Sequence, residues 1–149
     1  MKKKTLAQSN FDVWTLIGRV NHTIVKLRQK ELSEYKIPVR QLYVLRTIKT
    51  LGPNATLANV AKQVEREDHV ISKQAVRMEN DGLIVRIKNT SKSNLLKFEL
   101  TEKGSKMAKM SVQSRSLEKL FSTLSEEERT QIELILNKVL IQADGLAAH

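Results

Sequence analysis

The spacing of apolar residues predicts that the chain is mostly helical. Between Phe11 and Ser33, apolar positions recur every three or four residues and no glycine-proline pair interrupts them, which indicates one long helix over 11–33 with an apolar face. A second helix is expected over roughly 38–51, because Pro38 suits a first turn and Gly52-Pro53 suits an end.

A short helix followed by a more polar one is predicted next. Thr56 can cap the first of the pair, and the charged segment 65–68 separates it from the second, at about 68–81. One face of this later helix is apolar, with Ile71, Ala75 and Met78. The opposite face carries His69, Ser72, Lys73, Val76 and Asn80. The arrangement is typical of a helix-turn-helix whose second helix presents a polar face.

Two short segments after Gly82 have the period of β-strands. The apolar residues expected on one face of each strand are Leu83, Val85 and Ile87 in the first and Leu96, Phe98 and Leu100 in the second. The connection over 89–94 is polar and lacks an Asn-Gly turn, so a longer, solvated loop is expected. The pattern predicts a β-hairpin of the kind that forms a wing.

The remainder of the chain is predicted to form two long helices. Thr101 can cap the first, whose apolar positions continue to Leu124, and Ser125–Glu128 has the capping-box spacing that begins the second. Together with the helix over 11–33, these segments carry more apolar surface than a small lobe can cover. A second chain is expected to bury the surplus; the alternative is that the helices fold back on their own domain.

Length and composition limit the possible chemistry. The chain has 149 residues, of which 40% are hydrophobic, so one domain with a packed core is expected. It has no cysteine, and His22, His69 and His149 are too dispersed for metal-ligand spacing, so neither a metal nor a cofactor is expected. Met1–Lys4 leads into polar residues rather than the apolar block of a signal peptide, and no apolar run could span a bilayer, which predicts a cytoplasmic protein.

The net charge of +10 is concentrated in the first two-thirds of the chain. Basic residues exceed acidic ones by four over 1–34 and by six over 35–100, whereas the seven of each over 101–149 cancel. The predicted helix-turn-helix and wing therefore coincide with the most basic segment. Such a surface fits a polyanion, and the alternative is a basic surface that only keeps the protein soluble.

The sequence shows no motif for catalysis. It has no glycine-rich phosphate loop and no nucleophile elbow, and the consecutive carboxylates at Glu126–Glu128 suit the start of a helix. We therefore expect a protein that is not an enzyme.

The predicted order of helix, helix, short helix, polar-faced helix and wing is that of a winged helix-turn-helix. With this order, three segments resemble the MarR family of transcription regulators: Ile71–Lys73, Met78–Arg86 and Leu100–Gly104. Met78–Arg86 is similar to the pattern that ends the family's fourth helix and begins its wing, and Leu100–Gly104 is similar to the start of its fifth helix. The resemblance extends over nearly the whole chain.

The resemblance implies a mainly α fold with a small β-hairpin wing, formed as a single domain over 1–149. It implies that 11–33 and 101–148 are dimerisation helices and that 38–100 is the DNA-binding winged lobe. The expected protein is a homodimer that binds a pseudo-palindromic double-stranded operator, acts as a repressor and is released by a small aromatic ligand. In the wing, Lys92-Ser93-Asn94 replaces the family's Asp-Arg-Arg-like run, so the usual minor-groove arginine is missing.

Candidate site residues follow from these patterns. The residues expected to bind DNA are His69, Ser72, Lys73, Arg77, Lys88, Lys92 and Lys97. By resemblance, the residues expected to line a ligand crevice are Phe11, Trp14, His22, Tyr43 and Arg46; the alternative is that they are core residues. Arg86 is equally suited to contacting DNA and to pairing with Glu79 as a brace. Two other functions remain open: a winged helix that binds an acidic protein, and an architectural DNA-binding protein without an effector.

Overall fold

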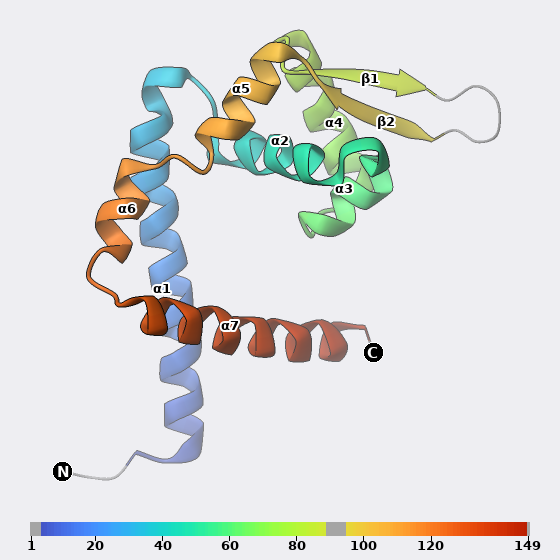
Figure 1. Ribbon diagram of the computed structural model, residues 1–149. Coiled ribbons are helices and arrows are strands. Elements are labelled where there is room, and N and C mark those ends of the chain that lie inside the picture. The colour runs from blue at the N-terminus through green and yellow to red at the C-terminus, as the bar shows by residue number, and fades with distance from the viewer. Residues whose placement is uncertain (1–3, 89–94, 149) are drawn as a thin grey trace. The chain divides into compact units, whose positions relative to one another are not determined.

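The computed structural model describes residues 4–88 and 95–148 and has the predicted fold class, mainly helical with a two-stranded hairpin. Contacts between residues group the chain into two compact units, Met1–Ser114 and Arg115–His149. The first unit contains helices α1 to α5 and strands β1 and β2, and the second contains helices α6 and α7 (Figure 1).

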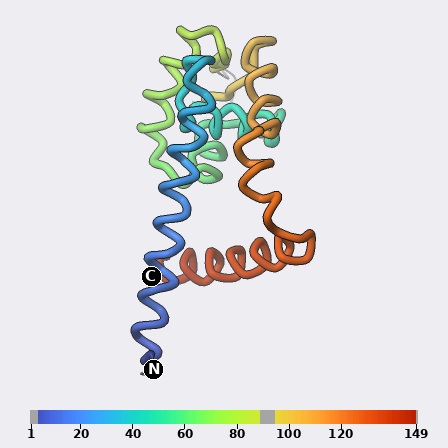
Figure 2. The backbone as a smooth tube through the Cα atoms, turned by 90° about the vertical axis from the view of Figure 1, so that its left-hand side faces the viewer, coloured from blue at the N-terminus to red at the C-terminus, as the bar shows by residue number. Residues whose placement is uncertain are grey.

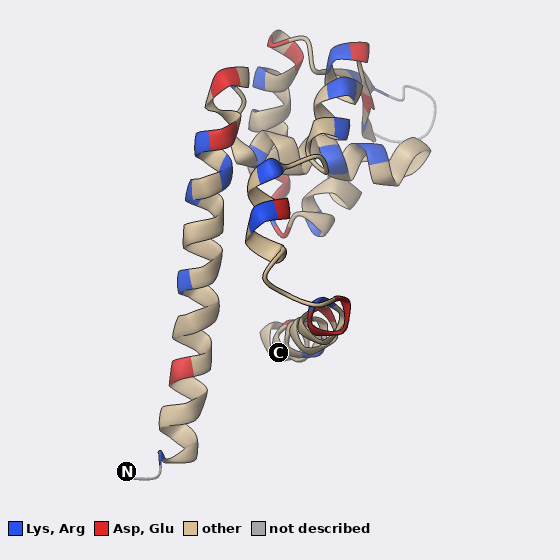
Figure 3. Cartoon of the chain, turned by 60° about the vertical axis from the view of Figure 1, so that its left-hand side comes forward, with Lys and Arg blue, Asp and Glu red and all other residues tan. Residues whose placement is uncertain are grey.

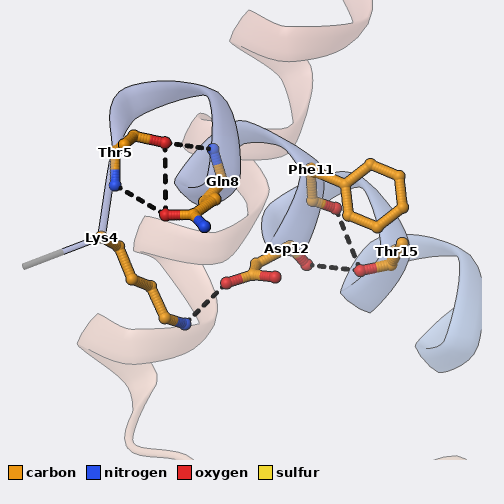
Figure 4. Close-up of polar contacts among 6 residues, drawn as sticks. All are labelled: Lys4, Thr5, Gln8, Phe11, Asp12 and Thr15. Carbon is orange, nitrogen blue, oxygen red and sulfur yellow. Dashed lines mark hydrogen bonds and ion pairs between the residues drawn. The ribbon is translucent and has the colours of Figure 1, made fainter. Parts of the chain in front are cut away.

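Helix α1, Leu6–Leu32, begins with a capping box. The Thr5 hydroxyl accepts a hydrogen bond from the Gln8 amide at 3.2 Å, and the Gln8 side chain accepts one from the Thr5 amide at 2.9 Å (Figure 4). Lys4 adds an ion pair with Asp12 at 2.6 Å. These local contacts start the helix earlier than the apolar pattern predicts, because a capped first turn needs no apolar stripe.

The two ends of α1 differ in their surroundings. Figure 2 shows that its N-terminal half projects from the rest of the first unit. Towards the C-terminal end Arg28 and Leu32 are buried, and the Gln29 side chain accepts a hydrogen bond from the Val39 amide at 3.1 Å. The helix is therefore anchored to the unit at its C-terminal end.

Three further helices form the helix-turn-helix region, as predicted. They are α2 at Val39–Leu51, α3 at Leu57–Gln63 and α4 at Asp68–Asn80. Pro38 lies at the N-cap of α2, and Gly52 at its end has a φ of +51°, a left-handed conformation that glycine adopts without strain. The Thr56 hydroxyl accepts a hydrogen bond from the Asn59 amide at 3.2 Å, which confirms the predicted cap of α3.

A single apolar core holds these helices and the hairpin together. Its large, fully buried side chains come from every one of these elements, namely Leu45 of α2, Val60 of α3, Ile71 and Met78 of α4, Ile84 of β1 and Phe98 of β2. Ile71, Ala75 and Met78 form the buried face of α4, as predicted. Burying an aliphatic side chain of this size contributes about 1.5–3 kcal/mol, so these contacts fix which side of α4 faces solvent.

Strands β1, Ile84–Lys88, and β2, Leu96–Leu100, form the antiparallel hairpin. Ile84 pairs with Leu100 and Arg86 pairs with Phe98. Phe98 is buried, as expected from the alternation in the second strand.

The predicted apolar face of the first strand is wrong. Val85 and Ile87 are 47% and 37% exposed, whereas Ile84 is buried. Leu83 is buried as well, but it lies before the strand, where its amide donates a hydrogen bond to the Met78 carbonyl at 2.9 Å. The alternation therefore begins at Ile84, one residue later than the sequence pattern indicates.

The predicted long fifth helix is also wrong, because the chain forms two short helices there. They are α5 at Glu102–Met110 and α6 at Arg115–Phe121. In the break, the Ser111 hydroxyl donates to the Ala108 carbonyl at 2.6 Å, and the buried Ser114 hydroxyl donates to the Glu31 carboxylate at 2.7 Å. The Arg28 guanidinium, paired with Glu31, donates to the Ser111 carbonyl at 3.4 Å. These side chains replace helical hydrogen bonds and end α5.

The start of α5 is packed against the turn before β1. The Thr101 hydroxyl accepts a hydrogen bond from the Gly104 amide at 3.0 Å and donates one to the Gly82 carbonyl at 2.6 Å. A Cβ atom on Gly104 would lie 1.9 Å from the Leu83 carbonyl oxygen. Glycine is therefore required at this position of the Leu100–Gly104 segment.

The second unit ends in helix α7, Glu126–Ala147, whose capping box is the one predicted. The Ser125 hydroxyl accepts a hydrogen bond from the Glu128 amide at 3.2 Å, and the Glu128 side chain accepts one from the Ser125 amide at 2.8 Å. The Arg129 guanidinium donates to the Leu124 carbonyl at 2.7 Å. Every residue of α7 is exposed in the single chain.

Candidate nucleic-acid interface

Helix α4 presents a polar and basic side to solvent. Since its apolar side is fixed in the core, residues spaced three or four apart on the opposite side point outward. The exposed residues of this outer side are His69, Lys73, Val76, Arg77 and Asn80, and Ser72 is half-buried at its edge. The structure therefore brings together the four DNA-binding candidates predicted on this helix.

A tight turn positions α4 after α3. The Arg66 amide donates a hydrogen bond to the Ala61 carbonyl at 2.9 Å, and Glu65 adopts a positive φ of 53°. The Ile71 amide then donates to the Glu67 carbonyl at 3.2 Å in the first turn of α4. These bonds form the turn of the helix-turn-helix and the first turn of α4.

The hairpin is tied to both helices of this motif. The Phe98 amide donates to the Ala55 carbonyl at 2.9 Å, next to the N-cap of α3. From α4, the Glu79 carboxylate accepts a hydrogen bond from the Arg86 amide at 2.9 Å and one from the Arg86 Nε at 2.7 Å. These hydrogen bonds therefore fix the position of the base of the wing relative to α4.

The Glu79–Arg86 pair answers the question that the sequence leaves open for Arg86. The backbone N–H of Arg86, and secondly its guanidinium, stabilise the carboxylate and hold the pKa of Glu79 below its ordinary value. Arg86 uses its backbone amide and its side chain on one carboxylate, so it is a brace between helix and strand.

In Figure 3, the positions of Lys and Arg are spread along the described elements of the winged lobe, the segment 38–100. Among the predicted wing lysines, Lys88 is exposed at the end of β1, and Lys97 is half-buried and pairs across the hairpin with Ile87. Lys92 lies outside the described residues, as does the rest of the 89–94 connection. The described part of the wing therefore contributes two lysines to the candidate interface.

The predicted ligand-binding residues fall into two separate groups within one chain. Phe11 and Trp14 are exposed on α1 with ring centroids 5.5 Å apart, and His22 is exposed further along the same helix. Tyr43 and Arg46 are exposed on α2. Trp14 precedes the α1–α2 contact at Gln29 by 15 residues, which is roughly 22 Å of helix. A single chain therefore does not bring Trp14 to Tyr43.

Tyr43 instead lines a cavity of about 300 Å³ between α2 and the helix-turn-helix. Arg40 and Thr47 on α2 and Gln74 on α4 line it as well, together with apolar residues including Val44. The patterns in the sequence did not predict these residues as part of a site. The spacing of Arg40, Tyr43 and Thr47, three and four residues apart on a helix whose other side is apolar, is the signal that could have found them.

Within residues 4–88 and 95–148, the structure contains no group of three or more histidine, aspartate or glutamate side chains that could hold a metal ion. No helix in these ranges is both long enough and apolar enough to cross a membrane.

Comparison with models of protein families finds no match for the chain, and a search of curated proteins finds none either. Solved structures do match. AbsC, a MarR family transcriptional regulator from Streptomyces coelicolor, aligns with a TM-score of 0.82 at 19% identity, covering 97% of this chain and 99% of that chain. The chain has the MarR fold.

Two further structures with the MarR fold were solved with bound molecules. A mutant of MarR from E. coli complexed with operator DNA matches with a TM-score of 0.77 at 22% identity, over 92% of this chain and 99% of that chain. The organohalide-sensing regulator RdhR in its 2,4-dichlorophenol-bound form matches with a TM-score of 0.77 at 22% identity, over 93% and 85%. At the level of the fold, these matches confirm the resemblance to the MarR family.

Proposed function

We propose that the protein is a dimeric, sequence-specific transcription regulator that binds double-stranded DNA, and that it is a non-catalytic repressor released by a small aromatic molecule. The observation that carries the proposal is the outer side of α4, where four predicted contact residues share one solvent-facing surface of a winged lobe with the MarR fold. The operator-bound structure of E. coli MarR, which has the same fold, supports DNA as the ligand.

In this proposal the two parts of the lobe have different tasks. Ser72 and Lys73 lie near the start of α4 and reach base edges in the major groove, with His69 and Arg77 at bases or phosphates. Lys88, Lys92 and Lys97 hold the phosphate backbone beside the groove. The helix therefore determines which sequence is bound, and the wing contributes affinity for any duplex.

Dimerisation is proposed to use 11–33 and 101–148, with 38–100 as the DNA-binding lobe of the single domain. The supporting observation is the exposed apolar surface of the two long helices. On α1 it includes Phe11, Val13, Trp14, Leu16 and Val20, and on α7 Leu134, Ile135, Leu136, Val139 and Ile141. Two lobes related by a two-fold axis can bind half-sites about one helical turn apart, ~34 Å, which gives a pseudo-palindromic operator.

The effector is proposed to be an aromatic molecule because RdhR, which has the same fold, was solved with 2,4-dichlorophenol bound. Its site would combine Tyr43 and Arg46 of one chain with Phe11, Trp14 and His22, and in a dimer the latter three can come from the other chain. Such a ligand releases DNA only if it binds the DNA-incompetent arrangement better than the competent one. Salicylate should therefore weaken operator binding and quench Trp14, the one tryptophan of the sequence.

The decisive experiment is DNA binding at several salt concentrations. Duplexes selected from a random pool provide the operator, and fluorescence anisotropy measures Kd for the operator and for a random duplex. The logarithm of affinity should fall with the logarithm of salt concentration by roughly 0.9 per phosphate contact. A flat dependence with no selected sequence contradicts the proposal and favours a winged helix that binds an acidic protein; selected DNA with no responding ligand favours the architectural alternative.

Three lysine variants separate the proposed tasks. Lys73→Ala should reduce the free energy of binding to the operator by about 1–3 kcal/mol and change the preference among operator variants. Lys88→Ala should weaken binding to the operator and to random duplex by the same factor. It should also reduce the slope of the logarithm of affinity against the logarithm of salt concentration by about one unit. Lys138→Ala in α7 is the matched control and should change neither. If Lys88→Ala alters base preference while Lys73→Ala acts uniformly, the division between helix and wing is wrong.

A further inference from the structure

Val76 is an apolar residue in the middle of the outer side of α4. It is 39% exposed, and it lies three residues after Lys73, four after Ser72 and four before Asn80. Residues at these spacings are neighbours on a helix surface, so Val76 is surrounded on this side by hydrogen-bonding side chains. The buried side of the helix is supplied by other residues, and Val76 contributes nothing to the core.

A second valine on the same helix shows that exposure alone does not explain Val76. Val70 is 40% exposed, but it lies beside the turn between α3 and α4, where it lines the cavity between α2 and the helix-turn-helix together with Val44 and Val64. Val70 therefore has apolar protein surface next to it. Val76 presents its two γ-methyl groups between Lys73 and Asn80, at the surface that the proposed function places against DNA.

The major groove offers one apolar group to such a side chain. Thymine carries a C5 methyl group there, whereas cytosine, adenine and guanine present hydrogen-bond donors and acceptors without it. We infer that Val76 contacts a thymine methyl group in each half-site of the operator and so makes the protein prefer thymine at that position. The inference rests on the proposed function, because it assumes that α4 enters the major groove.

The inference can be tested by removing the contact from either partner. The operator is first selected from random duplexes with the unchanged protein, and each thymine is then replaced by uracil, which lacks only the methyl group. One thymine in each half-site should be sensitive to this replacement. Uracil at that position of a single half-site should weaken binding about fourfold, because it removes about one methylene-sized contact. Val76→Ala removes the contact from both half-sites of the dimer, so it should weaken binding to the thymine duplex about sixteenfold, the square of the single-site factor. Combining the two changes should cause no further loss, because both remove the same contact.

Val70→Ala is the matched control, since it makes the same truncation on the same helix at equal exposure. In the Val70→Ala variant, replacing a thymine with uracil should weaken binding by the same factor as it does in the unchanged protein, at every position. The inference is wrong if the losses of affinity caused by uracil and by Val76→Ala multiply at every thymine. It is also wrong if the protein binds DNA but no thymine is sensitive to replacement by uracil. If the unchanged protein selects no sequence, the proposed function fails first and the inference fails with it.

Discussion

Leu45 in the winged lobe and Leu134 in α7 are the same residue type in helices of the same chain, yet the first is 0% exposed and the second 65% exposed. The contrast extends to their neighbours. Apolar residues of α2, α3, α4 and the hairpin meet in one core, whereas every residue of α7 is exposed in the single chain. The lobe forms a buried apolar core within one chain, whereas the apolar residues of α7 can be buried only against another surface.

Charge follows the same division. The net positive charge lies within 1–100, which includes the lobe, whereas 101–149 carries equal numbers of basic and acidic residues. A neutral segment can approach a second copy of itself without the repulsion that two basic lobes experience. The comparison therefore separates a self-contained, basic lobe from an apolar, neutral helix suited to association, and four experiments can test that separation.

The largest expected effect is in the core of the lobe. Phe98→Ala removes a side chain that is almost fully buried and should lower the free energy of unfolding by about 3–5 kcal/mol. Urea denaturation followed by circular dichroism measures it. Because the contacts lie within one chain, the loss should be the same at low and high protein concentration. A loss that shrinks on dilution would mean that the lobe depends on a partner.

Parts of both regions could be predicted from sequence because they depend on local signals. The caps at Thr56, Thr101 and Ser125 are short-range, and the structure confirms them. The face of β1 was not predictable in the same way, since period two fits both Leu83 and Ile84 as a start. The C-cap of α4 decides it, because the Leu83 amide donates to the Met78 carbonyl and this bond keeps Leu83 in the turn before the strand.

The break between α5 and α6 depends on residues that are distant in sequence. Ser114 is bonded to Glu31, and the Ser111 carbonyl to Arg28, so no pattern within 101–124 shows where the helix ends. The outer side of α4 was predictable because helical spacing places Lys73 and Arg77 opposite the apolar face. The cavity lined by Arg40 and Thr47 was not, because it forms only when α2 meets the helix-turn-helix.

The second effect concerns association through α7. Ile135→Asp introduces a charge into its exposed apolar surface and should weaken dimerisation by about 2–4 kcal/mol, as the loss of a central interface residue does. Light scattering at micromolar concentration should report twice 17.0 kDa for the unchanged protein and 17.0 kDa for the variant. The lobe should unfold at an unchanged urea concentration in the variant. An unaltered mass would remove α7 from the dimer interface.

The third effect compares two glycines in helices of the two units, Gly104 in α5 and Gly145 in α7. Gly104→Ala places a Cβ against the Leu83 carbonyl and should destabilise the first unit by about 1–3 kcal/mol. Gly145→Ala in α7 meets no atom within 4 Å and should stabilise its helix by up to about 1 kcal/mol, because alanine is the better helix former. Thermal unfolding of both variants measures the opposite signs. A Gly104→Ala variant that is as stable as the unchanged protein would contradict the packing described for α5.

The smallest effect comes from two glutamates whose pKa is held below its ordinary value. For Glu79 the cause is first the backbone amide of Arg86 and then its guanidinium, a contact between helix and strand. For Glu127 it is first its own backbone amide and then the Ser125 hydroxyl, a contact within the first turn of α7. A carboxyl group whose pKa is lowered by folding stabilises the folded state at any pH above its ordinary pKa. This contribution is lost as the pH falls through the depressed pKa.

Glu79→Gln should therefore destabilise the lobe at neutral pH. The difference in unfolding free energy from the unchanged protein should narrow as the pH falls below the ordinary value of 4.5 and disappear below the depressed pKa, where Glu79 is neutral in the folded state as well. Glutamine keeps an oxygen that can accept from the Arg86 amide, so the variant isolates the charge. Urea denaturation between pH 7 and pH 3 measures the difference. Glu127→Gln is the matched control: its contact is local to α7, so the unfolding midpoint of the lobe should be unchanged at every pH. A pH-dependent shift of that midpoint in the Glu127 variant would show that α7 and the lobe unfold as one unit, and the separation between the two regions would have to be abandoned.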